Sequence, residues 1–197
     1  MQKKNKIEHY QIKGIVCGCD EAGRGALAGP VVAAAVILPS FFYNSSINDS
    51  KKMTKKSRNE ISKLIKTKSI AWGVGIVDNK KIDKINILNA SIQAMHIAID
   101  VVLKKMKDQQ PDILLIDGNK FKSYKDIKHK CIIKGDEKFM SIAAASIIAK
   151  KYRDDLMNNL DTENPEYSWK KNKGYPTKEH RDAIIKHGVN KYHRKSF

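Results

Sequence analysis

Two carboxylates followed by a glycine-flanked arginine form the stretch of this sequence best suited to chemistry. Asp20 and Glu21 end an apolar run. Neighbouring strand side chains point to opposite faces, so we expect the two acids to share a site only where the strand ends and the backbone turns. Gly23 and Gly25 permit such a turn, because glycine tolerates positive φ and lets backbone approach a ligand closely. Arg24 adds a permanently charged fork that matches phosphate.

Two further acids stand where predicted strands stop. Asp117 closes the apolar run 112–117, and Asp136 follows the short run 131–133. All-oxygen ligand sets suit Mg²⁺ or Mn²⁺. Two such ions about 3.5 to 4 Å apart can activate water and stabilise the leaving oxygen in an attack on phosphate. Any one of these acids is more simply a cap, but three clusters in a basic chain favour a metal-dependent site.

The elements that must position these acids alternate between apolar runs of strand length and helical periodicity, which predicts an α/β fold. The first two strands should form a hairpin with acids at its turn. Thr54, Asp78 and Thr177 are predicted helix caps. Strands are expected at 15–19, 31–38, 70–77, 112–117 and 131–133, helices at 55–66, 80–107, 139–160 and after Thr177, and a polar loop at 161–174.

Composition indicates one globular domain with a polyanionic partner. The 197 residues are 41% hydrophobic and 30% charged, which are globular values. Lys and Arg number 38 against 21 acids, for a net charge of +17. Such an excess favours nucleic acid, although a solvated lysine-rich surface is the simpler alternative. We expect the basic runs 51–68 and 170–195 to contact phosphates.

Cysteine usage and the N-terminus favour a cytoplasmic protein. Cys17, Cys19 and Cys131 are too few and too irregular for a disulfide framework, so we expect reduced core thiols. Residues 1–12 should be a basic, partly ordered tail without the apolar segment of a signal peptide. The apolar stretch 26–38 is interrupted by Gly-Pro and is too short to cross a bilayer. The sequence does not favour a membrane role.

Two candidate side chains have simpler structural interpretations. Asp154 follows Lys150 by four residues, and Asp155 follows Lys151 by four, so salt bridges on a helix explain both acids. We favour this interpretation of Asp154 over metal ligation. His96 lies beside the apolar stripe of its helix and is expected to be structural rather than catalytic.

Seven blocks of the chain, in order, resemble one known family. They are Asp20-Glu21-Ala22-Gly23-Arg24-Gly25 with Ala28-Gly29-Pro30, then Asp49-Ser50-Lys51, Asp117-Gly118-Asn119, Lys134-Gly135-Asp136, the run from Ser141 to Lys150, Gly174-Tyr175-Pro176, and His193-Arg194-Lys195-Ser196-Phe197. Together they resemble bacterial ribonuclease HII over nearly the whole chain. One departure is Ala26, where the family often has proline.

The resemblance implies an RNase H-like fold, in which helices flank a central mixed β-sheet and a helical C-terminal part follows. It implies endonucleolytic cleavage of the RNA strand of RNA/DNA hybrids and incision at single ribonucleotides in duplex DNA. The ends would be 3′-hydroxyl and 5′-phosphate, and the role ribonucleotide removal in DNA repair and replication. A single catalytic domain would span 1–197, with a C-terminal loop and helix from about residue 160 helping to bind substrate.

The resemblance implies a role for each residue that matches a functional position of the family. Asp20, Glu21, Asp117 and Asp136 would be the catalytic acids that bind two Mn²⁺ or Mg²⁺ ions. Asp136 is the least secure, because family members differ at the fourth ligand. The rivals at that position are Glu137 and Asp154.

The resemblance also implies how substrate is recognised. Gly23, Arg24 and Gly25 would sense the ribose 2′-hydroxyl together with Tyr175, since this group separates RNA from DNA. Lys51 would lie near the scissile phosphate. Without the family match, Tyr175 would simply be a structural turn residue and Lys51 one member of a basic run. We further expect a monomer, with no C-terminal extension for a clamp-binding peptide.

Overall fold

The computed structural model of this chain describes residues 7–47, 53–107 and 109–197. The block Asp49-Ser50-Lys51 therefore lies outside the described residues. The predicted contact of Lys51 with the scissile phosphate stays a prediction.

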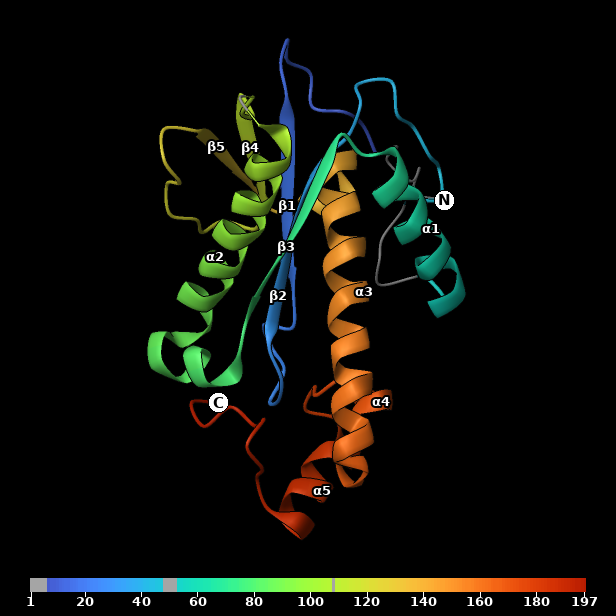
Figure 1. Ribbon diagram of the computed structural model, residues 1–197. Helices are drawn as coiled ribbons and strands as arrows, with labels where there is room; N and C mark the ends of the chain where they lie inside the picture. The colour runs from blue at the N-terminus through green and yellow to red at the C-terminus, as the bar shows by residue number, and fades with distance from the viewer. Residues whose placement is uncertain (1–6, 48–52, 108) are drawn as a thin grey trace.

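A five-stranded mixed sheet forms the centre of the fold (Figure 1). In chain order its strands are β1 (Val16–Ala22), β2 (Val31–Ile37), β3 (Ala71–Val77), β4 (Ile113–Asp117) and β5 (Lys128–Ile132). Their spatial order is β3-β2-β1-β4-β5. β1 pairs antiparallel with β2 and parallel with β4, so it is the central strand. The predicted α/β class is confirmed.

Helices cover both faces of the sheet (Figure 1). α1 (Lys55–Lys68) and α3 (Met140–Glu163) pack on one face, and α2 (Asn79–Met106) packs on the other. α3 approaches β1 so closely that a Cβ on Gly18 would lie 2.2 Å from the backbone of Ser141. The predicted caps Thr54, Asp78 and Thr177 each accept a hydrogen bond from a first-turn N–H. The close approach at Gly18 places the N-terminal part of α3 directly against β1.

α2 is the longest helix that the described residues contain, and it bends once. Asn86 has non-helical angles (φ 63°, ψ 165°), and its Oδ1 accepts a hydrogen bond from the Asn89 N–H, which starts the second part of the helix. By length and apolar composition α2 could also cross a membrane. Its buried side chains nevertheless pack on β1, β2 and β3, as those of a core helix do.

Two expectations about local structure, for the first two acids and for the polar loop, were wrong. Asp20 and Glu21 lie inside β1 and not at a turn, because pairing with β2 continues as far as Ala22. The described part of the N-terminal tail agrees with the expected partial order, since Ile7 is buried and the backbone of Glu8 pairs with the segment that starts α3, whereas Gln11 and Ile12 are exposed. The expected polar loop 161–174 is largely helical, with η2 at Pro165–Tyr167 and α4 at Trp169–Asn172.

A buried aromatic and histidine cluster joins this C-terminal part to α5 (Lys178–His187). The Trp169 indole N–H donates to His180 Nε2 over 3.0 Å, so the His180 proton resides on Nδ1 and is donated to the Tyr175 carbonyl, also at 3.0 Å. His193 lies next to His180, with 3.2 Å between their Nε2 atoms. Asn190 N–H donates to His193 Nδ1, which places the His193 proton on Nε2, where it shares the single lone pair of His180 Nε2 with the Trp169 N–H. Both imidazoles are therefore held neutral.

This cluster predicts a loss of stability in mild acid. Burial lowers the pKa of His180, and burial with the charge of His180 lowers that of His193 to about 4. An unfolded histidine has a pKa of about 6.5, so between that pH and about 4 the unfolded protein binds protons that the folded protein does not. The free energy of unfolding is therefore unaffected above about pH 6.5 and decreases as the pH falls toward 4. We expect His193→Gln to flatten the decline in Tm between pH 7 and 4. His187→Gln, on the exposed end of α5, should retain the wild-type slope, and equal slopes for both variants would contradict the assignment.

Candidate active site

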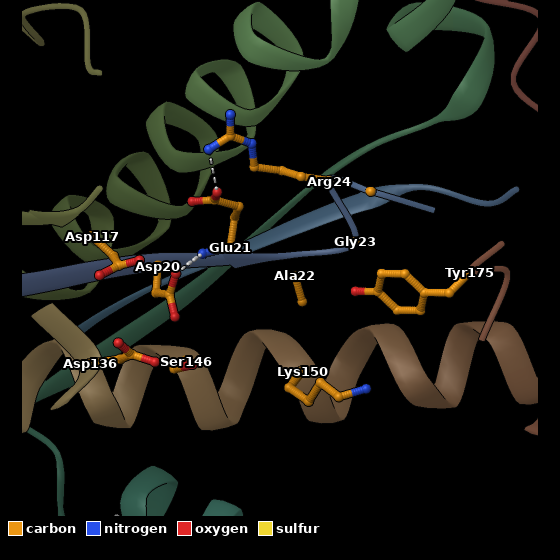
Figure 2. A pocket seen from close by; sticks show the side chains of 11 residues that line it. Asp20, Glu21, Ala22, Gly23, Arg24, Asp117, Asp136, Ser146, Lys150 and Tyr175 are labelled. Carbon is orange, nitrogen blue, oxygen red and sulfur yellow. Dashed lines mark hydrogen bonds and ion pairs between the residues drawn. The ribbon is translucent and has the colours of Figure 1, made fainter. Parts of the chain in front are cut away.

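A pocket of about 470 Å³ opens beside the C-terminal end of β1 (Figure 2). It gathers every predicted site residue that lies within the described part of the chain: Asp20, Glu21, Gly23, Arg24, Gly25, Asp117, Asp136 and Tyr175. Ala22, Ser146 and Lys150 complete the lining. Residues separated by up to 155 positions in sequence thus converge on one cavity.

The unequal lengths of β1 and β4 explain how the first two acids share this pocket. The pairing between the two strands ends at Cys19 with Ile116, whereas β1 continues to Ala22. Beyond that pair one edge of β1 is open on the side where β4 stops. Asp20 points toward α3 and Glu21 toward α2, as strand alternation requires, yet both flank the open edge (Figure 2). The site therefore lies at a notch in the sheet and needs no turn.

Burial and mutual repulsion make these carboxylates costly without a cation. The pKa of Asp20 is raised well above its ordinary value by burial and by the charges of Glu21 and Asp117. Burial also raises the pKa of Glu21, while Arg24, whose Nη1 lies 3.2 Å from Glu21 Oε1, opposes the rise. Carboxylate oxygens are the donors that Mg²⁺ and Mn²⁺ prefer. The donor chemistry of the pocket thus fits divalent ions.

The carboxylates are not yet gathered as ligands. Among the residues that the structure describes, no three Asp, Glu, His or Cys side chains are grouped closely enough to hold an ion. Glu21 is engaged by Arg24, and Asp20 Oδ1 accepts a hydrogen bond of 2.7 Å from the Glu21 N–H. One oxygen of Glu21 and one oxygen of Asp20 are thus already hydrogen-bonded within the protein.

A hydrogen bond places the fourth acid relative to the third. Asp117 Oδ1 accepts from the Gly135 N–H at 2.7 Å, which ties the end of β4 to the short helix η1 (Gly135–Glu137). Asp136 is carried by this helix, is buried and faces the pocket. Glu137 is exposed and does not line the pocket.

Asp154 is occupied by cations instead. Its carboxylate oxygens lie 2.5 Å from Lys150 Nζ and 3.3 Å from Arg58 Nη1, and it does not line the pocket. The predicted salt bridge is confirmed, and Arg58 from α1 adds a partner that the helical spacing could not indicate.

Two pocket residues on α3 were not singled out from the sequence. Ser146 hydrogen-bonds the Asp20 carboxylate and thereby offsets part of the rise in its pKa. Lys150 lies one turn further along the helix and adds a cation to the lining (Figure 2). Their spacing of four within an otherwise apolar run was the available signal, because such residues share one face of a helix.

The two glycines of the turn serve different purposes. Gly23 has φ +97°, and a Cβ there would lie 1.9 Å from Nε of the buried Arg153. At Gly25 a Cβ would meet no atom within 4 Å, although this residue lines the pocket. The fold therefore explains Gly23, whereas packing does not require a glycine at the exposed position 25.

The residues expected to be structural lie away from the pocket or inside the core. His96 Nε2 is 3.0 Å from the Lys122 carbonyl, and its ring packs on Phe121 and Tyr124. Cys17 and Cys19 are fully buried free thiols, and Cys131 is half-buried.

The contrast between the glycines predicts opposite effects of one methyl group. Gly23→Ala should cost about 1–3 kcal/mol for the backbone conformation alone, and more because Arg153 must move. Gly25→Ala should change the free energy of unfolding by less than about 0.5 kcal/mol. Urea unfolding of the two variants checks this, and equal losses would show that the fold constrains both glycines alike.

Comparison with known proteins agrees with this geometry. The family model for Ribonuclease HII matches residues 17–197. A curated Ribonuclease HII of Christiangramia forsetii is 59% identical over 191 residues, which are 97% of this chain and 94% of that protein.

Solved structures share the fold at low sequence identity. The ribonuclease H2 of Pyrococcus horikoshii OT3 superposes with a TM-score of 0.75 at 23% identity, covering 93% of each chain. Bst-RNase HIII in complex with Mn²⁺ gives a TM-score of 0.64 at 21% identity, over 76% of this chain and 55% of that one. The expected RNase H-like fold is confirmed. The chain belongs to the ribonuclease HII family and is a ribonuclease H enzyme of type HII.

Proposed function

We propose that this ribonuclease H cleaves the RNA strand of RNA/DNA hybrids and also incises duplex DNA at single embedded ribonucleotides. The products would carry 3′-hydroxyl and 5′-phosphate ends, and the cellular role would be the removal of ribonucleotides from DNA in the cytoplasm by a monomeric enzyme. The observation that carries the proposal is one pocket in which four acids stand beside a glycine-arginine-glycine turn and a tyrosine.

The acids would bind two Mn²⁺ or Mg²⁺ ions, consistent with a metal-dependent family. Asp20, Glu21, Asp117 and Asp136 are the residues proposed to hold them. Bound ions of this kind supply an activated water and stabilise the leaving oxygen of the phosphate. Asp136 is favoured as the fourth ligand because it faces the pocket, whereas Glu137 is exposed and Asp154 is neutralised by two cations.

The chain's own groups would do the remaining work of binding and orientation. Gly25 leaves room for a sugar to approach the backbone, and Tyr175 faces the same pocket. The half-exposed Arg24 side chain is free to turn from Glu21 toward a phosphate. Lys150 lines the pocket with its ammonium group paired to Asp154, and Lys51, outside the described residues, is proposed to lie near the scissile phosphate.

The proposed catalytic role of Asp117 predicts the effect of removing its charge. Asp117→Asn keeps an oxygen that can accept the hydrogen bond from Gly135, so the fold and the position of Asp136 should survive. Loss of one charged ligand should lower the rate of incision by about 1,000-fold or more. The measurement is cleavage of a duplex with one ribonucleotide at saturating Mn²⁺, alongside substrate binding by fluorescence anisotropy, which should persist.

Asp155→Asn is a matched control, because this acid lies on α3 outside the pocket, paired with Lys151. It should cut at the wild-type rate. A folded Asp117→Asn enzyme that does the same would overturn the catalytic assignment, and cutting of an all-DNA duplex by the wild type would overturn the proposed substrate.

The division between metal binding and substrate recognition predicts how Arg24→Ala behaves. Loss of the Arg24 guanidinium should weaken binding of the ribonucleotide-bearing duplex by about tenfold. Mn²⁺ affinity should be retained or increased, because the Arg24 guanidinium competes with a metal ion for the Glu21 carboxylate. Titration calorimetry with Mn²⁺ and anisotropy with duplex separate the two effects. A comparable fall in both affinities would contradict the division.

A further inference from the structure

Two buried arginines contact the turn at residues 23–25, which we call the recognition turn, or the segment that follows it, and neither lines the pocket. Arg153, on α3, is 1% exposed, and Arg194, near the C-terminus, is 4% exposed. The hydrogen bonds shown for both guanidinium groups go to backbone carbonyls. Neither group is therefore explained as half of a buried salt bridge.

Arg153 joins the segment after the turn to the segment before Tyr175. Its Nε donates to the Pro30 carbonyl at 2.9 Å and its Nη2 to the Ala28 carbonyl at 3.2 Å. Its Nη1 donates to the Lys173 carbonyl at 2.9 Å. The guanidinium carbon lies 5.2 Å from the centroid of the Tyr175 ring, so it also packs against the aromatic face.

Arg194 holds the turn itself from the opposite end of the chain. Nη1 donates to the carbonyl of Arg24 and Nε to that of Gly29, each at 3.0 Å. Its own N–H pairs with the Leu27 carbonyl at 2.8 Å. The Phe197 ring lies 5.0 Å from the guanidinium carbon and covers it.

Close packing leaves little room for these segments to shift. A Cβ on Gly23 would overlap Arg153, one on Gly29 would lie 2.4 Å from Met157 Sδ, and one on Gly174 would lie 2.6 Å from the Ala28 carbonyl oxygen. The backbone of the turn and the backbone before Tyr175 therefore meet around the Arg153 side chain at contact distance.

Among the residues that the structure describes, neither guanidinium group forms a salt bridge with a carboxylate, and burying a cation in this way is energetically costly. Burial lowers the pKa of both guanidinium groups, that of Arg194 to about 9 with the charge of Arg153 contributing. An apolar side chain of similar size avoids that cost. What it cannot do is donate several hydrogen bonds in fixed directions to carbonyls from separate segments, which is the property of the guanidinium fork.

We propose that Arg153 and Arg194 are positioning residues for ribose recognition, which set the recognition turn (23–25) at a fixed distance from Tyr175. This inference rests on the proposed function, in which these two elements read the 2′-hydroxyl. Arg194 fixes the carbonyl side of the turn, and Arg153 fixes the turn to the Tyr175 segment. The side of the turn that lines the pocket then remains available to substrate.

Lysine substitutions test the proposal, because lysine keeps the charge and loses the fork. For Arg153→Lys and Arg194→Lys we expect kcat/KM at a single ribonucleotide to fall about 10- to 100-fold, the effect of a misplacement near 1 Å. The ratio of affinities for the ribonucleotide-bearing duplex and the same all-DNA duplex should fall toward one. Mn²⁺ affinity by calorimetry should match the wild type, since the acids are held by other contacts.

Two further variants separate positioning from general stability. Ile99→Ala removes core volume on α2, away from the turn, and should lower Tm while keeping the wild-type affinity ratio. Phe197→Leu removes the aromatic ring that packs on the Arg194 guanidinium and leaves both arginines in place, so this variant should fold. It should lower the ratio of the two duplex affinities by a smaller factor than the lysine substitutions, and it remains informative if a lysine variant does not fold.

The outcomes distinguish this inference from the function on which it rests. A wild-type enzyme that binds both duplexes equally and leaves the ribonucleotide uncut would refute the proposed function. A selective wild type combined with unchanged ratios in folded Arg153→Lys, Arg194→Lys and Phe197→Leu would refute the positioning role. A ratio lowered equally by Ile99→Ala would also refute it, because general destabilisation would then explain the effect.

Discussion

The candidate active site depends on one mismatch in the sheet: β1 continues for three residues after its pairing with β4 has ended. Those three residues keep their partners in β2, so the strand stays straight while its other edge opens. At such an edge a side chain from each face can reach the same space. Asp20 and Glu21 share a pocket for this reason, and Asp117, at the end of the shorter strand, meets them there.

The acids form a high-energy arrangement that the surrounding structure holds in place. Burial and like charge raise the pKa of Asp20, so the folded protein contains a region that a cation would stabilise. The chain as a whole carries a formal net charge of +17. A polyanion can therefore approach the protein as a whole while metal ions bridge it to the acids, which is the electrostatic logic of the proposed nuclease.

The C-terminal part is joined to the rest of the fold by buried polar contacts as well as by an apolar cluster. His180 accepts from Trp169 and donates to the Tyr175 carbonyl, while Arg153 and Arg194 bind carbonyls on the other side. Directional bonds of this kind fix one geometry, whereas apolar packing alone tolerates sliding. Recognition in the proposed function would thus depend on residues far from the acids in sequence.

Local pattern and motif determined most of the elements and the composition of the site. The caps Thr54, Asp78 and Thr177 and the apolar periods were readable because capping and amphipathicity depend only on neighbours within a few residues. The tertiary structure decided what depends on distant partners: the notch beside Asp20, the placing of Asp136 in the pocket lining and of Asp154 in ion pairs with Lys150 and Arg58, and the burial of Arg153. A strand's length relative to its neighbour, and the partner of a buried charge, are set by contacts between segments that the sequence does not order in space.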